Sequence, residues 1–125
     1  MTKLKDGGHL DGEQPGVLLG LDAPDDCAVL APSTLASVHT VDFFRSFISD
    51  PYVFGKVAAN HALSDAHAMG AQPSGALAVA VVPYGLEGKV EETLFQMMSG
   101  ACEVLRESRC ALLGGHTCER DVTDA

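Results

Sequence analysis

The sequence has no tryptophan and few aromatic residues, which make up 6% of its 125 residues. Its apolar residues, 46% of the chain, are mostly small, with alanine the commonest. This composition is ordinary for a folded protein, and the length suffices for one domain with a real core. We therefore expect a core in which backbones pack closely, because few large rings are present to fill space.

Positive charge is also scarce. Eight Lys and Arg residues stand against 17 Asp and Glu residues, for a net charge of −9. A surface of this sign repels nucleic acid and anionic lipid, so we expect neither as a partner. If the domain binds a phosphate compound, a cation must neutralise the repulsion between the negative charges of the domain and of the phosphate.

Sequence signals for a membrane span, for secretion and for a zinc site are missing as well. No apolar run approaches the about 20 residues of a membrane span, and the charged, glycine-rich start is unlike a signal peptide. The four cysteines show no C-x-x-C spacing, which favours reduced structural thiols in a cytoplasmic protein. The histidines give no zinc spacing, since His61 and His67 would point to different sides of a helix.

The first half of the chain predicts a hairpin followed by a helix. Residues 27–31 and 36–41 are β-rich runs around a Pro-Ser-Thr turn. The Asp-Pro pair at 50–51 is typical of a helix start, and a stripe of small residues predicts a helix to about residue 69, close against a sheet. That stripe comprises Gly55, Ala59, Ala62, Ala66 and Met69.

The second half predicts a strand, a helix and a final short strand. Residues 75–82 are nearly all alanine and valine, which predicts a strand buried on both faces. A helix over about residues 89–108 follows, and then a strand at 110–113. The buried stripe of this helix is expected to comprise Val90, Leu94, Met97, Ala101 and Val104.

The element order β-β-α-β-α-β predicts an α+β fold, a ferredoxin-like sandwich with a four-stranded sheet and both helices on one face. The other sheet face is then bare, which predicts pairing with a second copy in a dimer. We expect residues 1–22 to be a flexible lead-in and residues 23–118 to form the domain. Residues 119–125 are expected to be a tail, with a second domain absent.

Carboxylates come from three separate predicted elements without nearby Lys or Arg. Asp25 and Asp26 precede the first strand, Asp42 ends the second, and Asp65 lies on the first helix. Mg²⁺ takes oxygen ligands and commonly bridges one or two carboxylates to substrate phosphates. A magnesium site is one interpretation. The other interpretation is that the Asp pair belongs to a turn and that the remaining carboxylates lie on solvated surface. The spacing of the residues leaves both interpretations open.

Gly-Gly-His-Thr at 114–117 follows the last predicted strand, where a loop is expected. Glycines there would let the backbone approach an anion closely. The stretch lacks the pattern of a P-loop, and a tight turn is the simpler explanation of it.

Five short stretches carry a more specific signal than spacing does. They are Thr-Val-Asp-Phe-Phe at 40–44, Asp-Pro-Tyr-Val-Phe-Gly at 50–55, Ala-Ala-Asn-His-Ala-Leu-Ser-Asp at 58–65, Ala-Met-Gly-Ala-Gln-Pro at 68–73 and Gly-Gly-His-Thr at 114–117. From about residue 25 to 117 the chain resembles selenide, water dikinase (selenophosphate synthetase). The related aminoimidazole ribonucleotide synthetase and thiamine-monophosphate kinase share some of these elements and are less similar around residues 40–44.

The resemblance implies an ATP- and Mg²⁺-dependent phosphotransferase that makes selenophosphate from selenide, ATP and water, releasing AMP and orthophosphate. It also implies a homodimer with nucleotide near the interface, and no covalent nucleophile. By position, Asp26 and Asp65 match magnesium ligands of the family. The residues that match its nucleotide contacts are Ala23, Pro24, Asp25, Asp42, Asp65 and, reaching the nucleotide of the other subunit, Gly115, His116 and Thr117.

The sequence departs from the family's pattern near its start. The family carries a Cys (or selenocysteine) and a Lys in a glycine-rich segment, whereas no Cys here precedes Cys27, and Lys3 and Lys5 lack that setting. Pro24 also replaces a usual glycine. A non-catalytic dimerisation or nucleotide-binding module therefore stays an alternative, as does another ATP-using relative such as thiamine-monophosphate kinase. The chain by itself is expected to be inactive.

Overall fold

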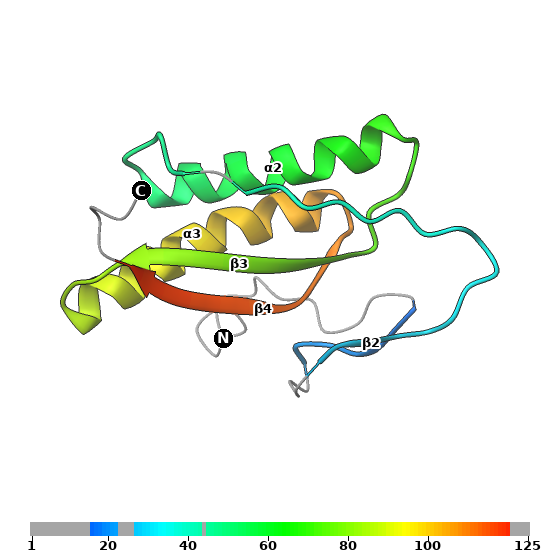
Figure 1. Cartoon of the computed structure of the whole chain (residues 1–125), viewed down its shortest axis with the longest axis horizontal. Helices are drawn as coiled ribbons and strands as arrows, with labels where there is room; N and C mark the ends of the chain where they lie inside the picture. The colour runs from blue at the N-terminus through cyan, green and yellow to red at the C-terminus, as the bar shows by residue number, and fades with distance from the viewer. Residues whose placement is uncertain (1–15, 23–26, 44, 121–125) are drawn as a thin grey trace.

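The computed structural model describes residues 16–22, 27–43 and 45–120. Predictions that fall on the other positions, among them Ala23, Pro24, Asp25 and Asp26, lie outside the described residues. In chain order the elements are β1 (Val17–Leu19), β2 (Val29–Leu30), α2 (Pro51–Ala68), β3 (Gly75–Pro83), α3 (Glu87–Glu107) and β4 (Ala111–Arg120). The fold is α+β, as predicted, with both helices on the same side of the β3–β4 sheet (Figure 1).

Helix α2 begins and ends where its sequence signals place it. The Asp50 carboxylate accepts hydrogen bonds from the backbone N–H groups of Tyr52 at 2.9 Å and Val53 at 3.3 Å, and Pro51 occupies the first helical position. These contacts satisfy N–H groups that have no partner inside the helix. After the helix, Gly70 adopts a positive φ of 71°, which glycine accommodates without strain.

The two helices pack on each other through a pair of reciprocal glycines. A Cβ atom added at Gly55 of α2 would overlap the carbonyl oxygen of Met97, and one added at Gly100 of α3 would overlap that of Tyr52. The small residues of α2 thus bring it close to α3, and α3 in turn contacts β3 and β4. The predicted stripe was only partly correct: Gly55 is buried, but it packs against α3 and not against a sheet, whereas Met69 is 73% exposed and Leu63, which lies outside the stripe, is buried.

Strands β3 and β4 are parallel neighbours joined through α3, a β-α-β unit. Their register runs from Gly75 opposite Ala111 to Pro83 opposite Arg120, with one irregularity after Ala76. Strand β4 is therefore longer than predicted, and it includes residues 114–117, which were expected to form a loop.

Strand β3 buries only one of its faces, although burial of both was predicted. Ala80 and Val82 are buried, while Leu77 and Val79 on the opposite face are 70% and 59% exposed. This alternation is the period of two expected of a sheet with one covered face. The bare apolar face on which the dimer prediction rests is thus present in the described structure.

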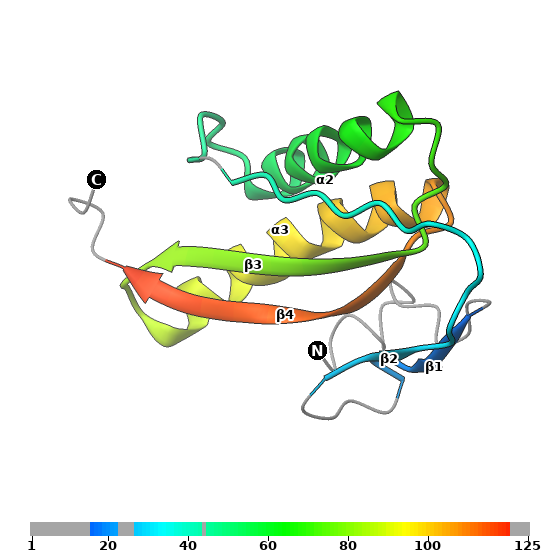
Figure 2. The ribbon, with the colours of Figure 1, turned by 45° about the vertical axis from the view of Figure 1, so that its right-hand side comes forward.

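The predicted hairpin and the single four-stranded sheet were wrong for the described residues. Strand β2 pairs antiparallel with β1, not with residues 36–41, which are extended but belong to no strand. The described strands form two sheets of two strands each, and Figures 1 and 2 show β1 and β2 set apart from β3 and β4. The short strand β1 was not predicted, because it lies in a glycine-rich stretch without periodicity.

The core lies where α2, α3 and the first residues of β4 meet. Its buried members are Leu63, Cys102, Val104, Leu105, Cys110 and Leu112. Burial raises the pKa of the Cys110 thiol to about 11, and it also raises that of Cys102. Both cysteines therefore act as small apolar side chains, as the sequence suggested. No described helix has the length and apolar character that crossing a membrane requires.

Candidate functional site

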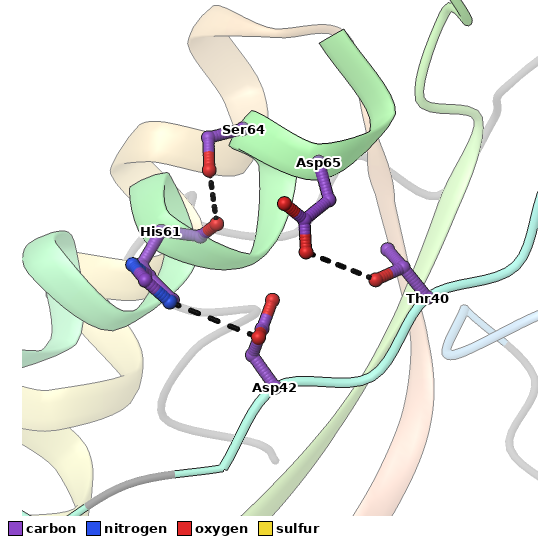
Figure 3. A network of polar contacts seen from close by, with 5 residues as sticks. All are labelled: Thr40, Asp42, His61, Ser64 and Asp65. Carbon is purple, nitrogen blue, oxygen red and sulfur yellow. Dashed lines mark hydrogen bonds and ion pairs between the residues drawn. The ribbon is translucent and has the colours of Figure 1, made fainter. Parts of the chain in front are cut away.

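Two of the predicted acidic residues, Asp42 and Asp65, converge between an extended segment and helix α2. Residues 36–43 run alongside α2 on their way to its start, and Figure 3 shows the Asp42 and Asp65 carboxylates facing the same space. Within the segment, Val41 and Phe43 are 91% and 70% exposed, whereas the Asp42 side chain is only 23% exposed. Extended backbone alternates its side chains, so Thr40 and Asp42 both turn towards the helix.

Crossed contacts join the segment to the helix. The Thr40 hydroxyl donates to Asp65 Oδ2 at 3.4 Å, while His61 Nε2 lies 3.7 Å from Asp42 Oδ1. His61 and Asp65 share a face of α2 because they are four residues apart. The neighbouring Ser64 hydroxyl donates to the His61 carbonyl at 2.6 Å and so stays on its own helix (Figure 3).

The electrostatic feature that stands out is an unsatisfied carboxylate oxygen. Asp42 Oδ2 is buried and has no hydrogen-bond partner. Among the described residues, neither Asp42 nor Asp65 forms an ion pair with Lys or Arg. A buried oxygen that carries negative charge is costly unless something coordinates it. The site is thus built to accept a cation or a hydrogen-bond donor.

The donor set fits a hard cation with oxygen ligands. The described residues contain no group of three or more His, Cys, Asp and Glu side chains arranged to hold a metal. Two carboxylates nevertheless suffice for Mg²⁺, which completes its shell with water and substrate phosphates. Asp42 and Asp65, whose carboxylates face the same space, could serve in this way.

The other predicted contact residues lie on a different element. Gly115, His116 and Thr117 are exposed positions of β4, and no hydrogen bond or ion pair of the described residues joins them to Asp42 or Asp65. Gly115 is required because a Cβ there would overlap the carbonyl oxygen of Ala78 on β3. The glycine therefore serves strand pairing, whereas the prediction gave it a loop.

Sequence reasoning missed the two residues that contact the carboxylates, Thr40 and His61. A usable signal for each was present. Thr40 lies two residues before Asp42, on the same side of an extended chain, and His61 lies four residues before Asp65, on the same side of a helix. The contact between residues 40 and 65 spans 25 positions, however, and no local pattern announces it.

A comparison with protein families identifies the family to which this chain belongs. The model of the AIR synthase related protein, N-terminal domain, matches residues 24–125. The chain belongs to this family. The predicted kinship to the aminoimidazole ribonucleotide synthetase-like superfamily is confirmed.

Curated relatives of this AIR synthase related domain are about two-fifths identical to it over the matched residues. The chain is 41% identical over 106 residues to selenide, water dikinase of Desulfitobacterium hafniense strain Y51, a match of 84% of this chain and 30% of that protein. It is 39% identical over 110 residues to selenide, water dikinase of Geobacter metallireducens, a match of 86% and 31%. The chain thus spans about three-tenths of the length of these relatives.

A solved structure resembles the AIR synthase related domain in three dimensions. The crystal structure of thiamine-monophosphate kinase from Stenotrophomonas maltophilia K279a superposes with a TM-score of 0.73 at 26% sequence identity. The match covers 87% of this chain and 34% of that one. The domain is therefore related to proteins named as kinases, by sequence and by structure.

Proposed function

We propose that this domain binds ATP with Mg²⁺ and forms the nucleotide-binding part of a selenide, water dikinase. The reaction would make selenophosphate from selenide, ATP and water, with release of AMP and orthophosphate. One observation carries the proposal: the Asp42 and Asp65 carboxylates share a site in which a buried Asp42 oxygen has no partner. The names of the similar proteins supply the reaction class.

Asp65 and Asp26 would hold magnesium, and Asp42 would contact the nucleotide largely through it. Bound Mg²⁺ would neutralise triphosphate charge, which matters here because the chain carries a net charge of −9. The chain's own residues would bind and orient. Ala23, Pro24 and Asp25 would line the nucleotide, and ionised Asp42 and Asp65 can only accept hydrogen bonds or coordinate cations.

We further propose that the domain works as a homodimer. The exposed apolar face of β3, with Leu77 and Val79, would be covered by a second copy. Gly115, His116 and Thr117 of one copy would then reach the nucleotide of the other. Their place on β4 supports this arrangement, because β4 is the parallel neighbour of β3 and adjoins its bare face.

Two alternatives compete with this reaction. The structural similarity to a thiamine-monophosphate kinase favours phosphorylation of that compound or of a related one. The second alternative is a module that binds nucleotide without turnover.

Product analysis separates the three possibilities. The proposed enzyme, of which this domain would be the nucleotide-binding part, is incubated with ATP and Mg²⁺, with selenide, with thiamine monophosphate or with neither, and the nucleotide products are measured. Our proposal predicts AMP and orthophosphate only when selenide is present. Consumption of ATP that depends on thiamine monophosphate would contradict it in favour of the first alternative. Nucleotide binding without turnover under all conditions would favour the second.

A further inference from the structure

The segment 36–43 is held in place by few polar contacts. Among the described residues, no backbone–backbone hydrogen bond involves it, and it belongs to no strand. Its contacts with α2 in Figure 3 are made by side chains, Thr40 with Asp65 and Asp42 with His61. The orientation of the Asp42 carboxylate therefore depends on these contacts and not on a sheet.

The two oxygens of Asp42 lie in different surroundings. Oδ1 faces the His61 ring at 3.7 Å, whereas Oδ2 is buried without a hydrogen-bond partner. On Asp65, Oδ2 accepts the Thr40 hydroxyl at 3.4 Å. In each carboxylate, one oxygen is thus engaged by a residue from the opposite element, and the other is left for a ligand.

We propose that Thr40 and His61 are positioning residues for the nucleotide–magnesium site, an inference that rests on the proposed function. Each engages one oxygen of the carboxylate that lies across from it, which fixes the plane of that carboxylate and docks segment 36–43 on α2. The orientation of the two carboxylates therefore depends on how segment 36–43 lies on α2. Loss of either contact leaves the carboxylates free to rotate, so that ordering them on binding costs affinity.

The test compares variants that keep or remove the hydroxyl at residue 40. Thr40→Val keeps the shape and loses the donor, Thr40→Ser keeps the donor, and Thr34→Val makes the same change at an exposed threonine outside the site. Mg-ATP affinity is measured by calorimetry. We expect about three- to tenfold weaker binding for Thr40→Val, the range of one hydrogen bond, and near-normal binding for the other two.

A second readout separates positioning from general stability. Amide hydrogen exchange of residues 38–43, measured without nucleotide, should accelerate in Thr40→Val and in His61→Leu. The thermal midpoint should change little, because segment 36–43 contributes no member of the buried core. A large fall in the midpoint of both variants, with unchanged local exchange, would overturn the proposal in favour of a merely structural role.

The failures of this proposal and of the proposed function are distinguishable. If Asp65→Asn weakens Mg-ATP binding and Thr40→Val does not, the positioning proposal is wrong and the nucleotide site stands. If Asp65→Asn and Asp42→Asn bind as well as the unaltered protein, or if the unaltered protein does not bind Mg-ATP, both are wrong.

Discussion

Replacement of Gly100 by alanine tests the close packing that holds α2 against α3. The added methyl group would overlap the Tyr52 carbonyl oxygen and lie 3.0 Å from its carbonyl carbon and 3.1 Å from the Lys56 nitrogen. These are backbone atoms of a packed helix, so the methyl group is accommodated only if the helices separate. Overpacking of this kind costs about 1–3 kcal/mol, and the cost rises when backbone must move.

Helix propensity acts in the opposite direction. Alanine is favoured over glycine by about 1 kcal/mol in a helix interior. Because the overlapping atoms are backbone, we place the overpacking cost in the upper part of its range, at about 2–3 kcal/mol. We therefore expect Gly100→Ala to lower the free energy of unfolding by about 1–2 kcal/mol net, a fall in the thermal midpoint of roughly 4–16 °C. Because α2 carries Asp65, a displaced helix should also weaken Mg-ATP binding.

Gly88 provides the matched control in the same helix. A Cβ added there meets nothing within 4 Å. Gly88→Ala should therefore raise the free energy of unfolding by up to about 1 kcal/mol, through propensity and the lower entropy of the unfolded chain. Thermal unfolding followed by circular dichroism compares the two variants. Equal or higher stability of Gly100→Ala would refute the packing described for α2 and α3.

Three further predictions concern the cap, the thiols and the bare sheet face. Asp50→Ala should cost about 1 kcal/mol in unfolding free energy, because two N–H groups of α2 lose their acceptor; an unchanged denaturation midpoint would contradict this. At pH 8 the exposed Cys118 should be alkylated far faster than Cys110, whose buried thiol has a pKa of about 11 and stays protonated; mass spectrometry of timed samples measures both. Leu77→Lys should turn a dimer at tens of micromolar into a monomer by light scattering, and a monomeric unaltered protein would refute the dimer.

The parts of the fold that sequence predicted correctly are those with local signals. A few adjacent residues determine where α2 begins, at Asp50–Pro51, and where it ends, at Gly70. The helix was therefore predicted to within a residue at each end. For the same reason α3 was found, although it begins at Glu87, two residues before the predicted start. Capping and periodicity require no knowledge of distant partners.

The errors arose where a distant partner decides the structure. Gly114 and Gly115 suggested the end of a strand, yet β4 continues because Gly115 allows the close approach of β3 at Ala78. Residues 36–41 have strand-forming composition, but side-chain contacts hold the segment to α2, and β1 is the partner of β2. Which strand pairs with which is a tertiary property that composition does not encode.

The candidate site shows the same division. The acidic residues Asp42 and Asp65 were predicted to act together, and the structure brings them to one space. The crossed contacts with Thr40 and His61 were not predicted, because they depend on how an extended segment lies on a helix. The predicted roles of Asp26 and its neighbours in the nucleotide site stay predictions.

Calorimetric titration of Mg-ATP into the protein and its Asp42→Asn and Asp65→Asn variants tests the central claim most directly. Glu107→Gln, which removes one negative charge at the exposed end of α3, controls for the change in net charge. We expect both Asn variants to bind at least about tenfold more weakly, because a neutral amide coordinates a cation poorly, and the control to bind normally. Equal affinity in all four proteins would contradict the account.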